Sequence, residues 1–300
     1  MSASRWAGIL RKLGHRVRVA FDYDGGPAEL MVAVHAWRSA ASIERFKARH
    51  PQRPLILQLS GTDIYGYLAS DSGPTLRSMA LADRLVALNE LAWRTVPRRL
   101  RSRLVFIPQS AVPPAVRTPS KRAVVISVIG HLRDVKDPLR AAEAARLLPT
   151  DSRVRVEQVG RAYTRSWAKR AHAEMAANPR YTWRGDVPAG AARRLLARSH
   201  AMVISSISEG GANVISEAAV AGVPILASRM DGNVGLLGPD YPGYFPVGGT
   251  RALARLLRRI ECDPAFVRQL TKAVAARTAL FHPRRELTAW RRLLAEVIRK

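Results

Sequence analysis

The stretch AMVISSISEGGANVISEAAVAGVPILAS, residues 201–228, decides the fold class. Two apolar runs, Ala201–Ser208 and Pro224–Ser228, enclose the segment Ala212–Ala221, whose pattern is helical. An apolar strand, a glycine-containing turn, a helix and a second apolar strand make a βαβ unit, which places two parallel strands in one sheet. We therefore predict an α/β fold for this part of the chain.

The same alternation of apolar runs and helical segments extends over most of the chain. We predict further strands at Arg16–Phe21, Leu30–Ala36, Pro54–Ser60, Arg84–Asn89, Leu104–Ser110, Ala123–Gly130, Val154–Gly160 and Tyr181–Arg184. We predict helices at Ser39–His50, Gly73–Ala82, Asp137–Leu148, Tyr163–Ala177 and Pro188–Ser199. Continuous apolar strands separated by helices are typical of parallel sheets that are covered on both faces. The predicted fold class is α/β with doubly wound, Rossmann-like parallel sheets.

A proline-containing stretch without periodicity, Ala111–Lys121, divides the chain. We predict a first Rossmann-like lobe at residues 1–112, a second at residues 121–281, and a terminal amphipathic helix at residues 282–300 that packs back toward the first lobe. The chain opens into a helical pattern at Arg5–Gly14. Because a doubly wound lobe ordinarily begins with a strand, we expect the first strand of this lobe to be missing.

The net charge of +26 is the strongest feature of the composition. Arginine supplies 42 of the 49 basic residues and is spread along the chain, as a GC-rich genome would produce without selection for binding. A basic nucleic-acid-binding protein is therefore a distant alternative, and we expect no nucleic-acid partner. The single cysteine, Cys262, and the lack of a secretory leader pattern favour the cytoplasm. No run approaches the roughly 20 apolar residues that a membrane span needs.

The segment Ser208–Asn213 is the first candidate site, because it joins a strand to a helix. In open parallel sheets, ligands bind beyond the carboxyl ends of strands, where backbone N–H groups at helix N-termini attract anions such as a diphosphate. Glu209 lies at the start of the loop and Glu217 lies within the helix, so one carboxylate can meet the hydroxyls of a sugar and the other a ribose. The alternative interpretation is a glycine turn followed by a solvated helix glutamate.

The second candidate site is GHLRDVKD, residues 130–137, which follows the first strand of the second lobe. Basic side chains stabilise the negative charge that develops on a departing phosphate. Arg133 and Lys136 are therefore candidate catalytic residues, although basic residues that cap a surface loop would show the same pattern.

Weaker signals follow three strands of the first lobe, at HAWRS (35–39), SGTDIY (60–65) and PQS (108–110). His35 is a candidate catalytic residue that positions or deprotonates an acceptor. The candidate acceptor-binding residues are Arg5, Arg38, Thr62 and Asp63. Each of these residues also fits a structural interpretation, such as a buried histidine with satisfied hydrogen bonds or an aspartate that caps a helix.

The Glu-x7-Glu spacing within EGGANVISEAAVAGVPILAS resembles the donor-binding signature of a large group of retaining GT-B glycosyltransferases. The resemblance implies two Rossmann-like lobes that face a cleft, with Glu209 at the donor sugar and Glu217 at the ribose. It also implies donor contacts for Gly210, Gly211, Asn213 and Val214, and a uracil position near the backbone of Asp186 and Val187. The group usually has an arginine where this chain has His131, and Arg133 is expected to take its place.

A narrower resemblance covers about residues 3–250. The segments that carry it are SRWAGILRKLGHRV, VHAWRSAAS, LSGTDIY, GHLRDVKDP, SEGGANVISEA and SRMDGNVGLLGPDYPG. They are similar to segments of the selenosugar synthases of selenoneine biosynthesis. This implies a glycosyltransferase that forms a carbon–selenium bond from selenophosphate and UDP-N-acetylglucosamine or UDP-glucose, with release of UDP. The UDP-sugar is then a substrate and no cofactor is expected, while the metal requirement stays open. Partners would be proteins that supply selenophosphate or use the selenosugar.

Two other functions fit part of the same sequence pattern. A GT-B glycosyltransferase that moves a sugar to the hydroxyl of a glycan, lipid or small molecule has the same donor motif. A dinucleotide-dependent oxidoreductase fits the sheet class, but no Gly-x-Gly-x-x-Gly turn follows any predicted strand.

Overall fold

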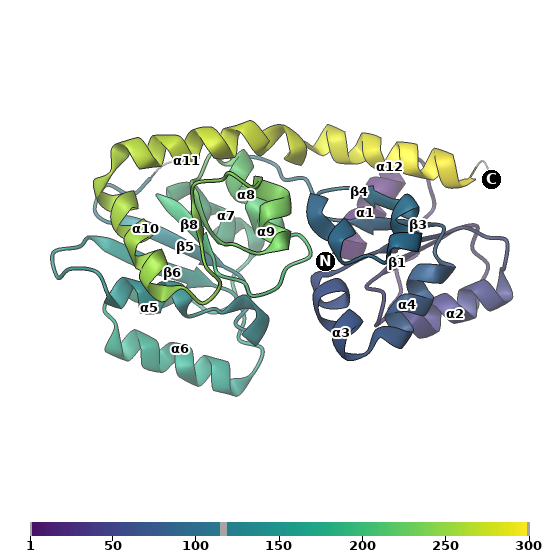
Figure 1. Ribbon diagram of the computed structural model, residues 1–300, viewed down its shortest axis with the longest axis horizontal. Coiled ribbons are helices and arrows are strands. Elements are labelled where there is room, and N and C mark those ends of the chain that lie inside the picture. The colour runs from purple at the N-terminus through teal and green to yellow at the C-terminus, as the bar shows by residue number, and fades with distance from the viewer. Residues whose placement is uncertain (1, 115–118, 299–300) are drawn as a thin grey trace. The chain divides into compact units, whose positions relative to one another are not determined.

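The computed structural model describes residues 2–114 and 119–298 of the chain. They form two compact units, each with its own parallel sheet (Figure 1). The first unit consists of Met1–Gln109, Glu209–Gly211 and Pro283–Lys300, and the second consists of Ser110–Ser208 and Ala212–His282. The α/β class with two parallel sheets is confirmed. The predicted connection Ala111–Lys121 includes residues 115–118, which lie outside the described residues.

The sheet of the first unit has four parallel strands in the order β1-β2-β3-β4. The strands are β1 (Met31–Val34), β2 (Leu55–Gln58), β3 (Arg84–Ala87) and β4 (Leu104–Phe106). The helices are α1 (Ser2–Lys12), α2 (Ala40–Arg49), η1 (Asp63–Tyr67), α3 (Leu68–Ser70), α4 (Ser72–Leu81), η2 (Glu90–Arg94), η3 (Arg98–Arg103) and α12 (Pro283–Ile298).

Alternate strand residues of the first unit enter two different cores, as a strand's period of two requires. Leu57 of β2 packs in a cluster with Ile43 of α2 and Met79 of α4. Ile56, the preceding residue, packs in a cluster with Trp6 of α1 and Trp290 of α12. The first sheet is therefore covered by helices on both faces.

The predicted strand Arg16–Phe21 is wrong, because this segment pairs with no strand in the described part of the chain. Val19 is 48% exposed and the side chain of Phe21 is fully exposed. The basic side chains that alternate with these apolar ones, such as Arg18 paired with Asp24, also lie in solvent. Within this segment Val17 is partly buried against the core that contains Trp6, and the other residues are exposed, so no continuous face is covered as a strand would require.

The sheet of the second unit has six parallel strands in the order β10-β9-β8-β5-β6-β7. The strands are β5 (Val124–Ile129), β6 (Val154–Val159), β7 (Tyr181–Trp183), β8 (Ala201–Ile204), β9 (Ile225–Ser228) and β10 (Tyr244–Phe245). The helices are η4 (Asp134–Lys136), α5 (Arg140–Arg146), α6 (Arg165–Ala177), α7 (Ala189–Arg198), α8 (Asn213–Val220), α9 (Asp231–Leu237), α10 (Thr250–Cys262), α11 (Pro264–Arg277) and η5 (Thr278–Phe281).

The strand order of the second unit reverses next to β5. The chain runs from β5 outward through β6 to β7, and then returns to place β8 on the other side of β5. The loops that leave β5 and β8 therefore diverge toward opposite faces of the sheet, which opens a crevice between them. This crevice is where an open α/β sheet ordinarily binds its ligand.

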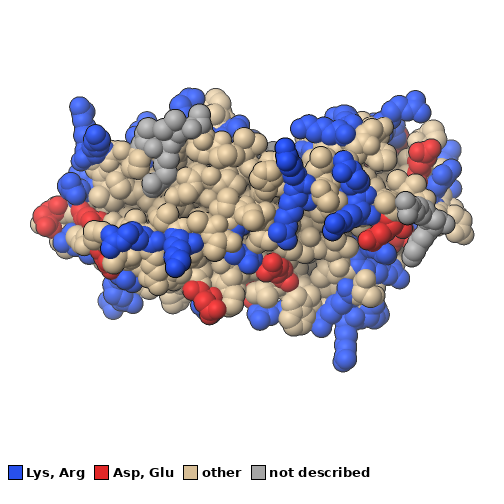
Figure 2. Space-filling view, turned by 90° about the horizontal axis from the view of Figure 1, so that it is seen from above, with Lys and Arg blue, Asp and Glu red and all other residues tan. Residues whose placement is uncertain are grey.

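Basic side chains are distributed over the surface. Figure 2 shows them scattered across one face and separated by uncharged residues, with few carboxylates between them. This distribution agrees with the spread of arginine along the sequence.

Candidate functional site

The residues directly after β8 and the first turn of α8 line one side of the crevice in the second unit. Helix α8 begins at Asn213, and its N-cap residue, Ala212, has no side chain that can accept from the first N–H groups of the helix. Such helix ends attract anions, because the unbonded N–H groups and the helix dipole both favour negative charge. The side chain of Asn213 donates to the carboxylate of Glu217 one turn later (2.9 Å) and thereby orients it.

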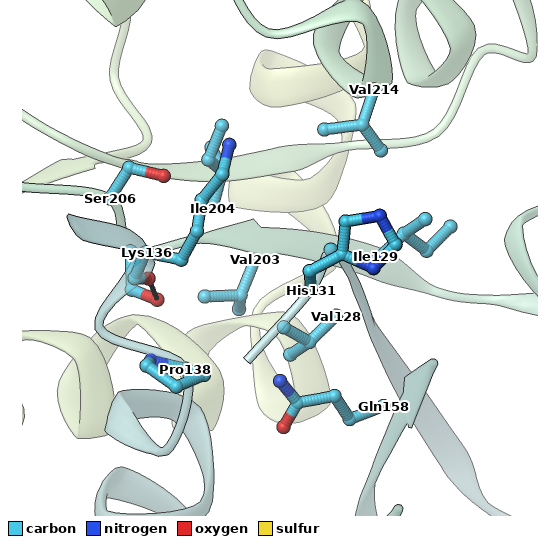
Figure 3. A pocket seen from close by; sticks show the side chains of 12 residues that line it. Val128, Ile129, His131, Lys136, Pro138, Gln158, Val203, Ile204, Ser206 and Val214 are labelled. Atoms are coloured by element: carbon cyan, nitrogen blue, oxygen red, sulfur yellow. Dashed lines mark hydrogen bonds between the residues drawn. The ribbon is translucent and has the colours of Figure 1, made fainter. Parts of the chain in front are cut away.

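A pocket lies at the carboxyl ends of β5 and β8, where the crevice was expected (Figure 3). His131 and Lys136 line it from the loop after β5, and Val214 lines it from α8. The other lining residues are Val128, Ile129, Gly130, Pro138, Gln158, Val203, Ile204, Ser205 and Ser206. The structure thus brings into one pocket Lys136, which was predicted as a catalytic residue, and Val214, which was predicted as a donor contact by resemblance.

Lys136 is the main charged group of this pocket. Loss of water around its ammonium, with a smaller contribution from the nearby Arg133, lowers the pKa of Lys136 to about 7. A lysine with a lowered pKa in a concave site is typical of functional positions. An anionic ligand bound beside such a lysine would favour the charged ammonium again.

His131 lines the same pocket with an imidazole that is harder to protonate than that of an ordinary histidine. Burial lowers the pKa of the imidazole, the carboxylate of Asp186 opposes this shift, and Arg161 and Arg133 add to it. Its Nδ1 accepts from the backbone N–H of Arg161 (3.1 Å). Because burial disfavours the imidazolium form, the ammonium of Lys136 and the guanidinium of Arg133 are the positive groups near this strand end. The guanidinium of Arg133 lies 5.7 Å from the ring centre of Tyr163.

The first unit holds a second cluster at the carboxyl ends of β1 and β2. The Nδ1 atom of His35 contacts the carboxylate of Asp63, and its Nε2 atom lies 2.9 Å from the hydroxyl of Thr62. Asp63 is fully buried and also accepts from the backbone N–H groups of Ala36 (3.0 Å) and Ser60 (2.7 Å). Nδ1 also lies 3.3 Å from the backbone N–H of Arg38, so the ring's tautomer decides whether Nε2 accepts from the Thr62 hydroxyl or donates to it.

The backbone conformation of His35 is a second unusual feature of this cluster. His35 has φ of 78°, in the left-handed region that residues other than glycine rarely adopt. Such a conformation persists only where surrounding contacts hold it, and it occurs often at functional sites. The ring contact with Asp63 and the hydrogen bond from the His35 N–H to the carbonyl of Gln58 (3.0 Å) are two such contacts.

The segment Glu209–Gly211 belongs to the first unit, where it packs against the ends of β2 and β3. A Cβ atom on Gly210 would lie 2.3 Å from the backbone nitrogen of Gly61, so neither position tolerates a side chain without a shift of backbone. Asn89 donates to the carbonyl of Gly210 (2.8 Å). Glu209 is buried, and these backbone contacts hold the peptide that follows it.

The sequence of this chain matches a known protein family. Residues 111–277 match the family described as glycosyl transferases group 1, which is more than half of the chain. The chain belongs to this family. No curated protein matches the sequence.

Solved structures share the fold of this glycosyltransferase at low sequence identity. HepE from Anabaena in complex with UDP is 16% identical, with 89% of this chain and 79% of that chain covered and a TM-score of 0.74. Sucrose-phosphate synthase from Thermosynechococcus elongatus is 19% identical, with 90% and 73% covered and a TM-score of 0.73. The trehalose-phosphate synthase of Burkholderia xenovorans is 12% identical, with 91% and 74% covered and a TM-score of 0.72. The fold is GT-B.

Two of the predicted acceptor-binding arginines of this glycosyltransferase have different surroundings. Arg5 forms two hydrogen bonds with the buried Glu286 of α12 (2.6 and 3.2 Å), and Trp6 donates to the same carboxylate (3.2 Å). This ion pair gives Arg5 a structural task, and its prediction as an acceptor-binding residue is untested. Arg38 is exposed, next to the His35 cluster in the sequence.

Ser205 and Gln158 are pocket residues that the sequence did not single out. Both lie on or directly after strands of the second sheet, so their position at a strand's carboxyl end was an available signal. Among the described residues, no group of three or more histidine, cysteine, aspartate or glutamate side chains is placed to hold a metal ion. No helix in the described ranges is long and apolar enough to span a membrane.

The pKa of Lys136 predicts how donor affinity depends on pH. The ammonium form favours a diphosphate, and in the free protein this form is lost as pH rises through about 7. Affinity for a diphosphate ligand, measured with UDP-glucose as the probe, is therefore expected to be highest below pH 7 and to fall by up to about tenfold per pH unit above it, the limit for loss of one proton.

Calorimetric titrations between pH 6 and pH 9 check this expectation. Lys136→Arg is the matched control, because a guanidinium keeps its charge over the whole range. A wild-type profile that is flat, or that equals the profile of the arginine variant, would contradict the assignment.

Proposed function

We propose that this glycosyltransferase takes its sugar from a UDP-sugar. The observation that carries the proposal is the pocket at the β5–β8 crevice, where Lys136 and the N-terminus of α8 offer positive charge beside one another. A diphosphate is the part of a nucleotide sugar that needs such a site. The UDP in the HepE complexes supports the choice of nucleotide, since that protein shares the fold.

In this proposal each predicted donor residue has a distinct task. Lys136 and Arg133 stabilise the negative charge that grows on UDP as the bond to the sugar breaks. Glu217 binds the ribose, and Glu209 contacts the donor sugar. The remaining predicted donor contacts are Gly210, Gly211, Asn213, Val214 and the backbone near Val187.

We further propose selenophosphate as the acceptor, on the resemblance to the selenosugar synthases. Its selenium attacks the anomeric carbon, the carbon–selenium bond forms, and the bond from that carbon to the UDP oxygen breaks with its electron pair on UDP. His35, oriented by Asp63, is proposed to act on the acceptor side together with Thr62. A highly charged acceptor also suits the exposed Arg38.

A conventional acceptor is the second candidate function. The ion pair between Arg5 and Glu286 leaves Arg38 as the other predicted arginine for a small anion. The sucrose-phosphate and trehalose-phosphate synthases share the fold, and their names imply sugar rather than selenium acceptors. Transfer of a sugar to a hydroxyl uses the same donor pocket.

Product analysis separates the two candidates. The protein is incubated with UDP-glucose or UDP-N-acetylglucosamine, with and without selenophosphate, and UDP and selenium-bearing sugars are measured by mass spectrometry. The selenosugar proposal predicts UDP release that depends on selenophosphate and yields a sugar with a carbon–selenium bond. Release of UDP that is indifferent to selenophosphate would overturn it in favour of a conventional acceptor.

A further inference from the structure

The loop that carries Lys136 is held in an unusual conformation. It passes through the short helix η4 and ends at Asp137, which has φ of 45° and ψ of 57°. Aspartate enters the left-handed region more often than most residues, but even there its side chain needs local contacts that hold it. The Asp137 carboxylate binds Arg140 through two hydrogen bonds (2.7 and 3.2 Å), and Arg140 also donates to the hydroxyl of Thr250.

The turn after β8 binds the same loop from the other side of the crevice. Ser205 is buried, and its hydroxyl donates to the carbonyls of Lys136 (3.2 Å) and Asp137 (2.8 Å). The backbone N–H of Ile207 donates to the carbonyl of Val135 (2.9 Å). Three successive carbonyls of the Lys136 loop are thus fixed by one turn of another strand.

That turn is itself anchored to the next strand. The hydroxyl of Ser228, at the end of β9, donates to the carbonyl of Ser206 (2.6 Å). The side chain of Asn233 in turn donates to the carbonyl and the hydroxyl of Ser228 (2.9 and 3.1 Å). Ser205 therefore links the Lys136 loop to the ends of β8 and β9. The link consists of buried hydrogen bonds that water does not replace.

We propose that Ser205 is a positioning residue, which holds the backbone of Lys136 so that the ammonium meets the donor diphosphate. Lysine has a long flexible side chain, so a fixed backbone narrows the range of positions that its ammonium can take. Ser205 lines the same pocket as Lys136. The inference rests on the proposed function, since the ligand of Lys136 comes from it.

A double-mutant cycle tests this role. Ser205→Ala is expected to lower kcat/KM for UDP release from UDP-glucose by about fivefold to tenfold, the effect of one lost buried hydrogen bond. In a Lys136→Ala background the same change is expected to have no further effect, because residues that act as a unit do not add. Ser199→Ala is the control, since it also removes a buried hydroxyl that donates to a backbone carbonyl, that of Leu195 (2.7 Å).

A ligand-free measurement separates failure of this inference from failure of the proposed function. Lysines are reductively methylated with ¹³C, and the Lys136 signal is identified by its absence from Lys136→Ala. Its titration midpoint is expected to move toward the ordinary lysine value in Ser205→Ala and to stay in place in Ser199→Ala. An unchanged midpoint in Ser205→Ala, or additive losses in the cycle, would overturn the role of Ser205. If the wild-type protein binds no UDP-sugar, the proposed function fails, and the midpoint alone decides whether Ser205 holds the loop.

Discussion

Replacing Lys136 with alanine is expected to lower turnover by about 100-fold to 1,000-fold, the range found when one preorganised group that stabilises developing charge is removed. The variant should keep the folded structure of the wild type. Because the folded state lowers the pKa of Lys136 to about 7, burial of the ammonium opposes folding at any pH where the unfolded lysine is charged. The free energy of unfolding of Lys136→Ala should therefore equal or exceed that of the wild type.

The sign of this stability effect depends on pH. A lysine whose folded pKa lies below its unfolded pKa destabilises the protein fully below the folded value. This penalty disappears as pH rises from about 7 toward the unfolded value. Urea unfolding at pH 6 and pH 9 should show a larger gain for Lys136→Ala at the lower pH.

The control for this variant is Lys169→Ala, which removes an exposed lysine of α6. Turnover is followed as UDP release from UDP-glucose or UDP-N-acetylglucosamine. A near-normal rate for Lys136→Ala, or a loss of stability that explains the lost rate, would exclude the catalytic role.

Glu209→Ala is expected to lower turnover by about 100-fold or more, because a buried carboxylate that contacts the reacting sugar acts at the bond that breaks. Unlike Lys136→Ala, this variant should still bind UDP, since Glu209 is proposed to touch the sugar and not the diphosphate. The neighbouring backbone contacts of Gly210 with Gly61 and Asn89 remain, so the loop should keep its place.

Turnover and UDP affinity of Glu209→Ala are measured together, and unfolding by circular dichroism. The matched control is Glu44→Ala, which removes a partly exposed carboxylate that pairs with Arg77 on the surface. A Glu209→Ala protein that loses UDP binding as well as turnover would place Glu209 at the nucleotide instead. Normal turnover would remove it from the site.

The strand positions of the second sheet were largely predictable from the sequence, and their lengths were not. The apolar run Ala201–Ser208 predicts a strand, but β8 ends at Ile204 because its ladder with β9 stops there. The two-residue strand β10 is too short to leave a pattern. The apolar segment Arg16–Phe21 looked like a strand because local alternation does not reveal whether a partner strand is present.

The candidate site was predictable where it depended on strand ends. Lys136 and the α8 N-terminus follow β5 and β8, which are neighbours in the sheet at the point where the strand order reverses, so the sheet class brings them together. The contacts of Ser205 with the loop 68 and 69 residues earlier depend on tertiary packing and left no sequence signal. The pairing of Arg5 with Glu286, 281 residues away, is of the same kind and changed the expected task of that arginine.

The central claim is that the pocket around Lys136 holds the diphosphate of a UDP-sugar. It is tested most directly by calorimetric titration of UDP into the wild type, Lys136→Ala and Glu209→Ala under one set of conditions. The account predicts saturable binding of one UDP by the wild type, a loss of binding in Lys136→Ala, and binding close to that of the wild type in Glu209→Ala. Binding of UDP that is unchanged by Lys136→Ala, or a wild-type protein that binds no UDP, would contradict it.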